Sequence, residues 1–251
     1  FKQKTAYEIG VRLVGSEMCI RDRAIPVDDV DWAVGEIERN AKRSFRTIMI
    51  HAAYPEGCPP YRDTHYDPIW SRCEEMGLPI TLHIITGRIP DPLFAYKRED
   101  QEEGPNNLLG TYEEIPHTIA NEFIYGEIID RFPGMRLLTG ELELSWIPHN
   151  MMRIDMMQGV FSDRLSLPTL EMKASDYVRT RVWHGLIEDK FGLGGLEMIG
   201  ETQVCWGSDF PHSIAIGAEA KEAVENILGG LGSESRHRLA SENAKTLLGW
   251  H

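Results

Sequence analysis

The sequence predicts an α/β fold built on a parallel sheet, and three observations lead to this prediction. Short apolar segments alternate with amphipathic helical segments from residue 24 to residue 251. The connections between them carry no hairpin signals, which indicates strands joined by helices and running parallel. The length of 251 residues suits one domain of the size of an α/β barrel.

The first half of this segment opens with a strand end at 24–26 and a helix at 27–42. In this helix Val30, Ala33 and Ile37 recur at helical spacing behind two aspartates that can cap it. There follow, in order, a β-branched strand at 47–51, a helix at 67–76 with an early proline and a glycine stop, and an apolar strand at 79–84.

The charged stretch 91–107 is expected to be a surface lid or a disordered loop. After it the alternation resumes, with helices identified by apolar residues three or four apart and strands by short apolar runs. In order, we expect helix 115–131, strand 136–139, helix 146–157, strand 181–184, helix 193–199, strand 204–207, and helices 218–228 and 233–248.

Composition excludes several classes of partner. The net charge of −13 argues against nucleic acid, whose phosphates require a basic surface. No apolar run approaches the roughly 20 residues of a membrane span, so no membrane partner is expected. The 4 cysteines are too sparse for a disulfide scaffold and show no Cys-x-x-Cys spacing, which favours a cytoplasmic location.

Residues 1–23 have neither the apolar core of a signal peptide nor the composition of a transit peptide. The run Arg-Leu-Val-Gly-Ser-Glu-Met-Cys-Ile-Arg-Asp within them resembles a translated sequencing adapter. We therefore expect 1–23 to be an artefact, the native domain to cover 24–251, and its first part to lie upstream. The alternative is a genuine amphipathic N-terminal helix.

Two residues stand where an apolar strand ends. Asp209 follows the strand at 204–207, and His83 lies near the end of the strand at 79–84. The carboxyl ends of parallel strands are where ligands bind, and imidazole and carboxylate are zinc or manganese ligands. The alternatives are a capping aspartate and a core histidine.

Four motifs occur in an order that resembles the amidohydrolase-related family. They are Gly-Leu-Pro-Ile-Thr-Leu-His at 77–83, Gly-Glu-Leu-Glu-Leu-Ser-Trp-Ile-Pro at 140–148, Trp-Gly-Ser-Asp-Phe-Pro-His at 206–212 and Ser-Glu-Asn-Ala-Lys-Thr-Leu-Leu at 241–248. The resemblance spans 24–251. This branch of the amidohydrolase superfamily also contains decarboxylases of the aminocarboxymuconate-semialdehyde and resorcylate types.

The resemblance implies a (β/α)8 TIM-type barrel, incomplete at the N-terminus because its first two strands are missing. It also implies one divalent metal ion, zinc with manganese as the alternative. By motif match His83 and Asp209 are metal ligands. The family's His-x-His pair is absent from the sequence, and its strand is expected upstream of residue 24.

The remaining candidates come from the same match and from the surrounding strand ends. Glu141 stands where many members carry a catalytic histidine, so it is a candidate ligand or general base, or else a capping or salt-bridged glutamate. His212 follows the Asp-aromatic-Pro motif and is a candidate for orienting Asp209 or contacting substrate, or else a loop histidine. Substrate-binding candidates near the mouth are His51, Arg62 and His184, and Arg62 suits a carboxylate substrate.

The implied function is a metal-dependent hydrolase that uses metal-activated water on a small carbonyl or carboxylate compound. A nonoxidative decarboxylase on the same scaffold is the first alternative, because the departure at 140–143 lies where that choice is partly made. A non-catalytic ligand-binding barrel is the second. Association as a homodimer is common in such barrels.

Overall fold

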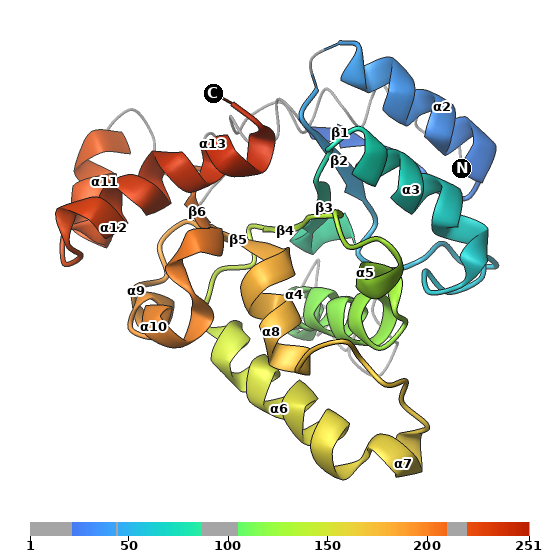
Figure 1. Ribbon diagram of the computed structural model, residues 1–251. Coiled ribbons are helices and arrows are strands. Elements are labelled where there is room, and N and C mark those ends of the chain that lie inside the picture. The colour runs from blue at the N-terminus through green and yellow to red at the C-terminus, as the bar shows by residue number, and fades with distance from the viewer. Residues whose placement is uncertain (1–21, 44, 87–104, 210–219, 251) are drawn as a thin grey trace, which may run out of the picture.

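The computed structural model describes residues 22–43, 45–86, 105–209 and 220–250 (Figure 1). Its centre is a parallel sheet of six strands in the order β1-β2-β3-β4-β5-β6, so each strand pairs with the next along the chain. The strands are β1 (Asp22–Ala24), β2 (Thr47–Ile50), β3 (Ile80–His83), β4 (Leu137–Gly140), β5 (Val182–Leu186) and β6 (Val204–Trp206). This winding is that of a TIM-type barrel, of which the described residues form a part.

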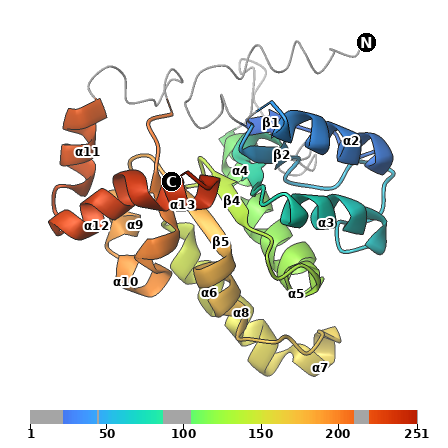
Figure 2. The ribbon, with the colours of Figure 1, turned by 45° about the horizontal axis from the view of Figure 1, so that its top comes forward.

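Helices connect the strands. They are α2 (Val30–Ala41), α3 (Asp67–Glu75), α4 (Pro105–Thr118), α5 (Ile128–Arg131), α6 (Trp146–Val160), α7 (Ser162–Leu165), α8 (Ala174–Arg181), α9 (Lys190–Leu193), α10 (Leu196–Ile199), α11 (Ala220–Leu228), α12 (Ser233–His237) and α13 (Asn243–Leu248). Two π-helical segments, Ile119–Ile124 and Arg238–Glu242, lie between them. In both views α2 and α3 lie at one end of the sheet and α11 to α13 at the other (Figures 1 and 2).

The two faces of the sheet bury different sets of side chains. On the outer face Ile48, Ile80, Leu82 and Val204 belong to the main apolar core, which the surrounding helices complete. On the inner face a smaller cluster joins Leu138, Trp183 and Cys205 to Leu247 of α13. Because side chains alternate along a strand, this division decides which strand residues can reach the interior of the barrel.

Six strands are present as predicted, although the first one lies at Asp22–Ala24 and not at 24–26, and the helix expected at 146–157 is present as well. The helix expected at 115–131 is instead the end of α4, a π-helical turn and α5, and a second π-helix interrupts the one expected at 233–248. Helix α8 was not predicted. Of the expected lid at 91–107, residues 91–104 lie outside the described residues, and 105–107 begin α4.

No helix in the described part of the chain is both long and apolar enough to span a bilayer.

Candidate active site at the carboxyl ends of the strands

His83 is the last residue of β3, and its side chain is buried against the inner face of the sheet. Its Nε2 lies 2.9 Å from Oε1 of Glu141, which follows β4. Gly140 is the register partner of His83, and a Cβ at that position would lie 3.0 Å from His83 Cδ2. The glycine thus leaves room for the imidazole to lie beside the neighbouring strand and meet Glu141.

Carboxylates at the ends of two strands have left-handed backbone conformations. The φ angles are 59° at Glu141, 63° at Glu143 and 49° at Asp209. Residues other than glycine seldom adopt such angles, and those that do cluster at functional sites. The turn at Asp209 leaves its side chain only 4 % exposed directly beyond β6.

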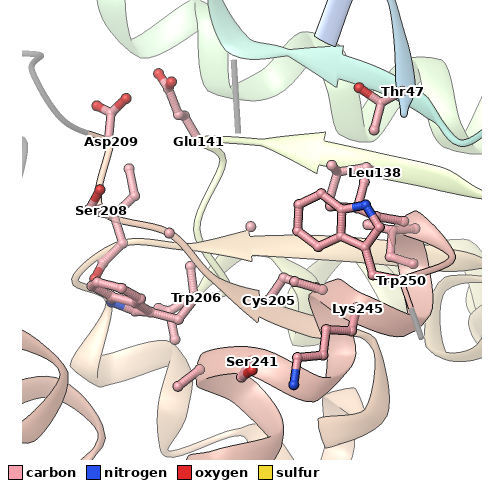
Figure 3. Close-up of a pocket in the computed structure, with 18 residues that line it drawn as sticks. Thr47, Leu138, Glu141, Cys205, Trp206, Ser208, Asp209, Ser241, Lys245 and Trp250 are labelled. Carbon is pink, nitrogen blue, oxygen red and sulfur yellow. The ribbon is translucent and has the colours of Figure 1, made fainter. Parts of the chain in front are cut away.

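Glu141 and Asp209 line one end of a cavity of about 300 Å³ between the sheet and the C-terminal helices. Their carboxylates lie next to each other and point the same way, whereas Thr47, Leu138 and Trp250 line the other end (Figure 3). Apolar and aromatic residues form most of the wall; they include Leu138, Leu186, Ile187, Cys205, Trp206, Leu247, Leu248 and Trp250.

The described lining residues of this cavity carry more acidic than basic side chains. Among its described lining residues Lys245 carries the positive charge, and its Nζ lies 2.7 Å from Oε1 of Glu242. Among the described lining residues the two carboxylates thus outnumber the one lysine, which already has a partner outside the cavity. This part of the lining favours a cation over an anion.

The donor atoms of this edge suit a divalent metal in kind. A neutral imidazole with carboxylate oxygens is a donor set that zinc and manganese accept. In number the set is incomplete, because no group of three His, Cys, Asp or Glu side chains in the described residues is close enough to share an ion. His83 and Asp209, with Glu141 between them in sequence, are the donors that this edge offers.

His184 lies elsewhere. It follows Trp183 on β5 and therefore points to the outer face, where it is fully buried. Its Nε2 lies 3.2 Å from the carbonyl of Val178 in α8, and its ring meets Trp146 edge to face. Burial lowers the pKa of His184 to about 4. The structure thus gives this histidine a packing position behind the sheet and not at the mouth.

Arg62 is engaged within the fold. Its guanidinium lies 2.5 Å from Oε1 of Glu122, a buried residue of the π-helical segment Ile119–Ile124, and its backbone N–H donates to the same carboxylate. His51 follows β2 with an exposed side chain, and its carbonyl accepts a hydrogen bond from the Tyr61 hydroxyl. Neither residue lines the cavity.

His212 lies outside the described residues. Two carboxylates that the sequence did not single out, Glu143 and Asp189, bind backbone amides of the loops that follow β4 and β5. A lone glutamate and a lone aspartate in loops carry no sequence signal for this role.

Comparison with known families and structures agrees with this architecture. The sequence profile of the Amidohydrolase family matches residues 20–250. No curated protein gave a significant match.

Solved structures give matches over most of the chain. An amidohydrolase from Mycobacterium avium subsp. paratuberculosis has a TM-score of 0.71 at 19 % identity, over 90 % of this chain and 57 % of its own. A 5-carboxyvanillate decarboxylase from Sphingomonas paucimobilis has a TM-score of 0.71 at 22 % identity, over 89 % of this chain and 64 % of its own. A dihydroxybenzoic acid decarboxylase from a Polaromonas species has a TM-score of 0.74 at 20 % identity, over 98 % of this chain and 75 % of its own. That structure contains manganese and the inhibitor 2-nitroresorcinol.

At sequence identities of 19 to 22 % the similarity to these proteins shows the fold of this chain. The chain spans less than two thirds of the length of the first two of these proteins.

Proposed function

Because the chain belongs to the amidohydrolase family, we propose that its cavity is the active site of a metal-dependent enzyme that decarboxylates a small aromatic acid. The observation that carries this proposal is the pair of carboxylates at one end of a cavity with an otherwise mostly apolar and aromatic wall. Such a wall suits a ring, and a few polar groups at one end orient it. The dihydroxybenzoic acid and 5-carboxyvanillate decarboxylases of similar fold support this substrate class.

His83 and Asp209 are the proposed metal ligands, and Glu141, which contacts His83, is the proposed general base beside them. When bound, a divalent ion such as manganese or zinc would offset the carboxylate charge and polarise the oxygens of the substrate acid. Gly140 keeps the His83 imidazole beside Glu141, and the burial of Asp209 holds its carboxylate at the end of β6. These residues thereby orient an acid that the negative cavity would otherwise repel.

Asp209 is the proposed proton carrier for the reaction. Its carboxyl group donates a proton to the ring carbon that bears the substrate carboxylate. The bond between that carbon and the carboxylate then breaks, carbon dioxide leaves, and the electron pair of the bond restores the aromatic ring. Water returns the proton to Asp209, so the reaction needs no oxidant or reductant.

Hydrolysis of an ester, amide or lactone is the second candidate. The observation that favours it is the 2.9 Å contact between His83 Nε2 and Glu141 Oε1. A glutamate held in this way at a strand end is suited to take a proton from an attacking water. The two reactions share a scaffold and differ in the product that must be measured.

The test uses the 251-residue chain supplied with MnCl2 or ZnCl2. Metal binding is measured by calorimetry, and 2,6-dihydroxybenzoate and 5-carboxyvanillate are assayed for release of carbon dioxide by mass spectrometry. Asp209→Asn is expected to lower the rate by a factor of about 100 or more. Glu197→Gln, the same change at an exposed residue of α10, is expected to keep it.

Each result has one consequence. Metal-dependent release of carbon dioxide that Asp209→Asn abolishes supports the decarboxylase. Metal-dependent ester hydrolysis without release of carbon dioxide from the acids establishes the second candidate in its place. A chain that binds neither ion and catalyses neither reaction overturns the metalloenzyme proposal.

A further inference from the structure

Glu143 joins the loop after β4 to the loop after β5. Its two carboxylate oxygens accept hydrogen bonds from the backbone N–H groups of Ile187 and Glu188, each 3.0 Å long. Glu143 lies two residues after Glu141 and has the same left-handed backbone conformation. The side chain does not line the cavity, so the proposed reaction gives it no part.

Asp189 makes the reciprocal connection. Its Oδ2 accepts the backbone N–H groups of Leu144 and Ser145 at 3.0 and 2.6 Å, and its Oδ1 accepts that of Gly192 at 2.7 Å. Each loop thus supplies a carboxylate to backbone amides of the other. The two loops pack closely at Gly192, because a Cβ at that position would lie 2.5 Å from both Asp189 Oδ2 and Leu144 Cβ.

The end of strand β6 is attached to the same loop after β5. The carbonyl of Ile187, whose N–H binds Glu143, accepts the indole N–H of Trp206 at 3.2 Å. Trp206 ends β6, three residues before Asp209. A continuous series of hydrogen bonds therefore runs from Glu143 through Ile187 to the strand that carries Asp209, while the chain itself links Glu143 to Glu141.

We propose that Glu143 is a positioning residue that, braced by Asp189, fixes Glu141 and Asp209 relative to each other at the carboxyl ends of β4 and β6. The proposal rests on the proposed function, since that function places these two carboxylates in one active site, Asp209 as a metal ligand and Glu141 beside it. It adds a residue that acts only through the backbone. Hydrogen bonds that orient a ligand from outside the coordination shell commonly change metal affinity by a factor of 10 to 100.

The chemistry of Glu143 makes an amide substitution a sharp test. Burial raises the pKa of Glu143, against the hydrogen bonds from Ile187 and Glu188, which lower it. Both oxygens act as acceptors, so a glutamine of equal size satisfies one N–H and turns its NH2 group toward the other. Glu143→Gln therefore removes one hydrogen bond and opposes two donors without opening a cavity.

The first measurement is amide hydrogen exchange in the full chain without metal. Glu143→Gln is expected to raise the amide exchange rates of Ile187 and Glu188 at least tenfold. It should also raise those of Leu144 and Ser145, because the two loops hold each other through reciprocal hydrogen bonds. Exchange in the paired strand β5 should stay unchanged. Asp189→Asn should give the same pattern, and the double variant little more than either single one. Glu197→Gln is the matched control and should leave all these amides as they are.

The second measurement is the absorption spectrum of bound Co²⁺, which reports the geometry of its ligands, together with Co²⁺ affinity. Glu143→Gln is expected to shift the spectrum and weaken affinity by a factor of about ten, whereas Glu197→Gln changes neither. Unchanged exchange in Glu143→Gln, or an unchanged spectrum and affinity, overturns the positioning role. Failure of the wild-type chain to bind Co²⁺ overturns the proposed function, and amide exchange at Ile187 and Glu188 then decides alone whether Glu143 holds the two loops together.

Discussion

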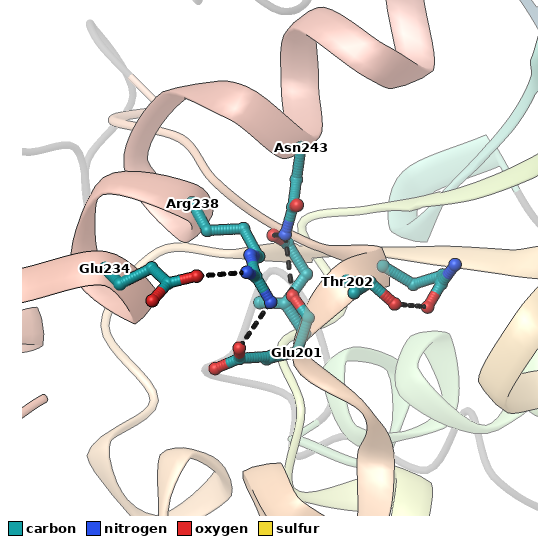
Figure 4. A network of polar contacts seen from close by, with 7 residues as sticks. Glu201, Thr202, Glu234, Arg238 and Asn243 are labelled. Atoms are coloured by element: carbon teal, nitrogen blue, oxygen red, sulfur yellow. Dashed lines mark hydrogen bonds and ion pairs between the residues drawn. The ribbon is translucent and has the colours of Figure 1, made fainter. Parts of the chain in front are cut away.

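Replacement of Asn243 by alanine should destabilise the protein by about 2–4 kcal/mol. Asn243 is 4 % exposed, and its Nδ2 donates to the carbonyls of Glu201 and Val204 at 2.6 Å each (Figure 4). These bonds attach α13 to the start of β6. Each net hydrogen bond contributes about 0.5–1.5 kcal/mol, and a buried carbonyl left without a donor costs about 1–3 kcal/mol.

The assay is urea unfolding at pH 7, monitored by tryptophan fluorescence, with three variants. Asn243→Ala tests the loss of both bonds. Asn243→Asp keeps the size but sets an anion against two carbonyl oxygens, so it should lower the free energy of unfolding at least as much. Thr246→Ala, at an exposed residue of the same helix, should cost less than about 0.5 kcal/mol.

The reasoning predicts a large difference between a buried donor and an exposed hydroxyl. An Asn243→Ala protein with an unfolding free energy within about 0.5 kcal/mol of the wild type would refute this reasoning, since the loss of two buried hydrogen bonds should cost more than that. An Asn243→Asp protein as stable as the wild type would refute it as well, because the role would then not depend on the amide donor.

Two further predictions concern the histidines. Burial depresses the pKa of His184 to about 4, so as the pH falls below 6.5 protons bind the unfolded chain before the folded one. This histidine should therefore lower the free energy of unfolding by about 2 kcal/mol between pH 7 and pH 5. Urea titrations at the two pH values should show a smaller decrease in His184→Gln, and an equal decrease in both proteins would contradict the assignment. Gly140→Ala should cost about 1–3 kcal/mol, because the new methyl group lies 3.0 Å from His83 Cδ2. Gly35→Ala in α2 places the added carbon more than 4 Å from any described atom outside the local helix backbone, so it should instead stabilise the protein. Equal effects of the two substitutions would exclude the close contact at Gly140.

The strands were predictable because each is a short buried run between helices. Thr47–Ile50, Ile80–His83 and Val182–Leu186 are buried at every position, and continuous burial leaves an apolar, β-branched signature in the sequence. Each strand pairs with the next one along the chain, so their order in the sheet is the order in the sequence. The architecture therefore depends on features that a single sequence displays.

The helices were less predictable where packing overrides local preference. The π-helical turns Ile119–Ile124 and Arg238–Glu242 shift the hydrogen-bonding pattern without a sequence signature. Helix α8 is only 8 residues long and polar overall, so the helical spacing of its buried Ala174, Tyr177 and Val178 covers little more than one turn. Neither feature therefore gives a strong periodic signal in the sequence.

The candidate site was partly predictable, because strand ends are visible in the sequence and side-chain direction is not. Strand-end logic identified His83 and Asp209, and the family resemblance added Glu141; the structure places all three at the same edge. The same logic applied to His184 overlooked the alternation along β5, where Trp183 takes the inner face and His184 the outer. Arg62 was an expected substrate contact, but its partner Glu122 lies 60 positions away in sequence.

Three carboxylates share one strained geometry at this edge, and their surroundings separate their roles. A left-handed residue other than glycine costs about 1–2 kcal/mol, so something in each local structure must offset the strain. At Glu143 two backbone amides do so, and the carboxylate is directed away from the cavity. Glu141 and Asp209 have the same backbone conformation but belong to the lining of the cavity. Glu127 and Ser166 adopt the same conformation elsewhere in the fold, so the backbone angle by itself does not mark a site. What distinguishes Glu141 and Asp209 is their place in the lining of the cavity, and for that reason they are the carboxylates of the proposed active site.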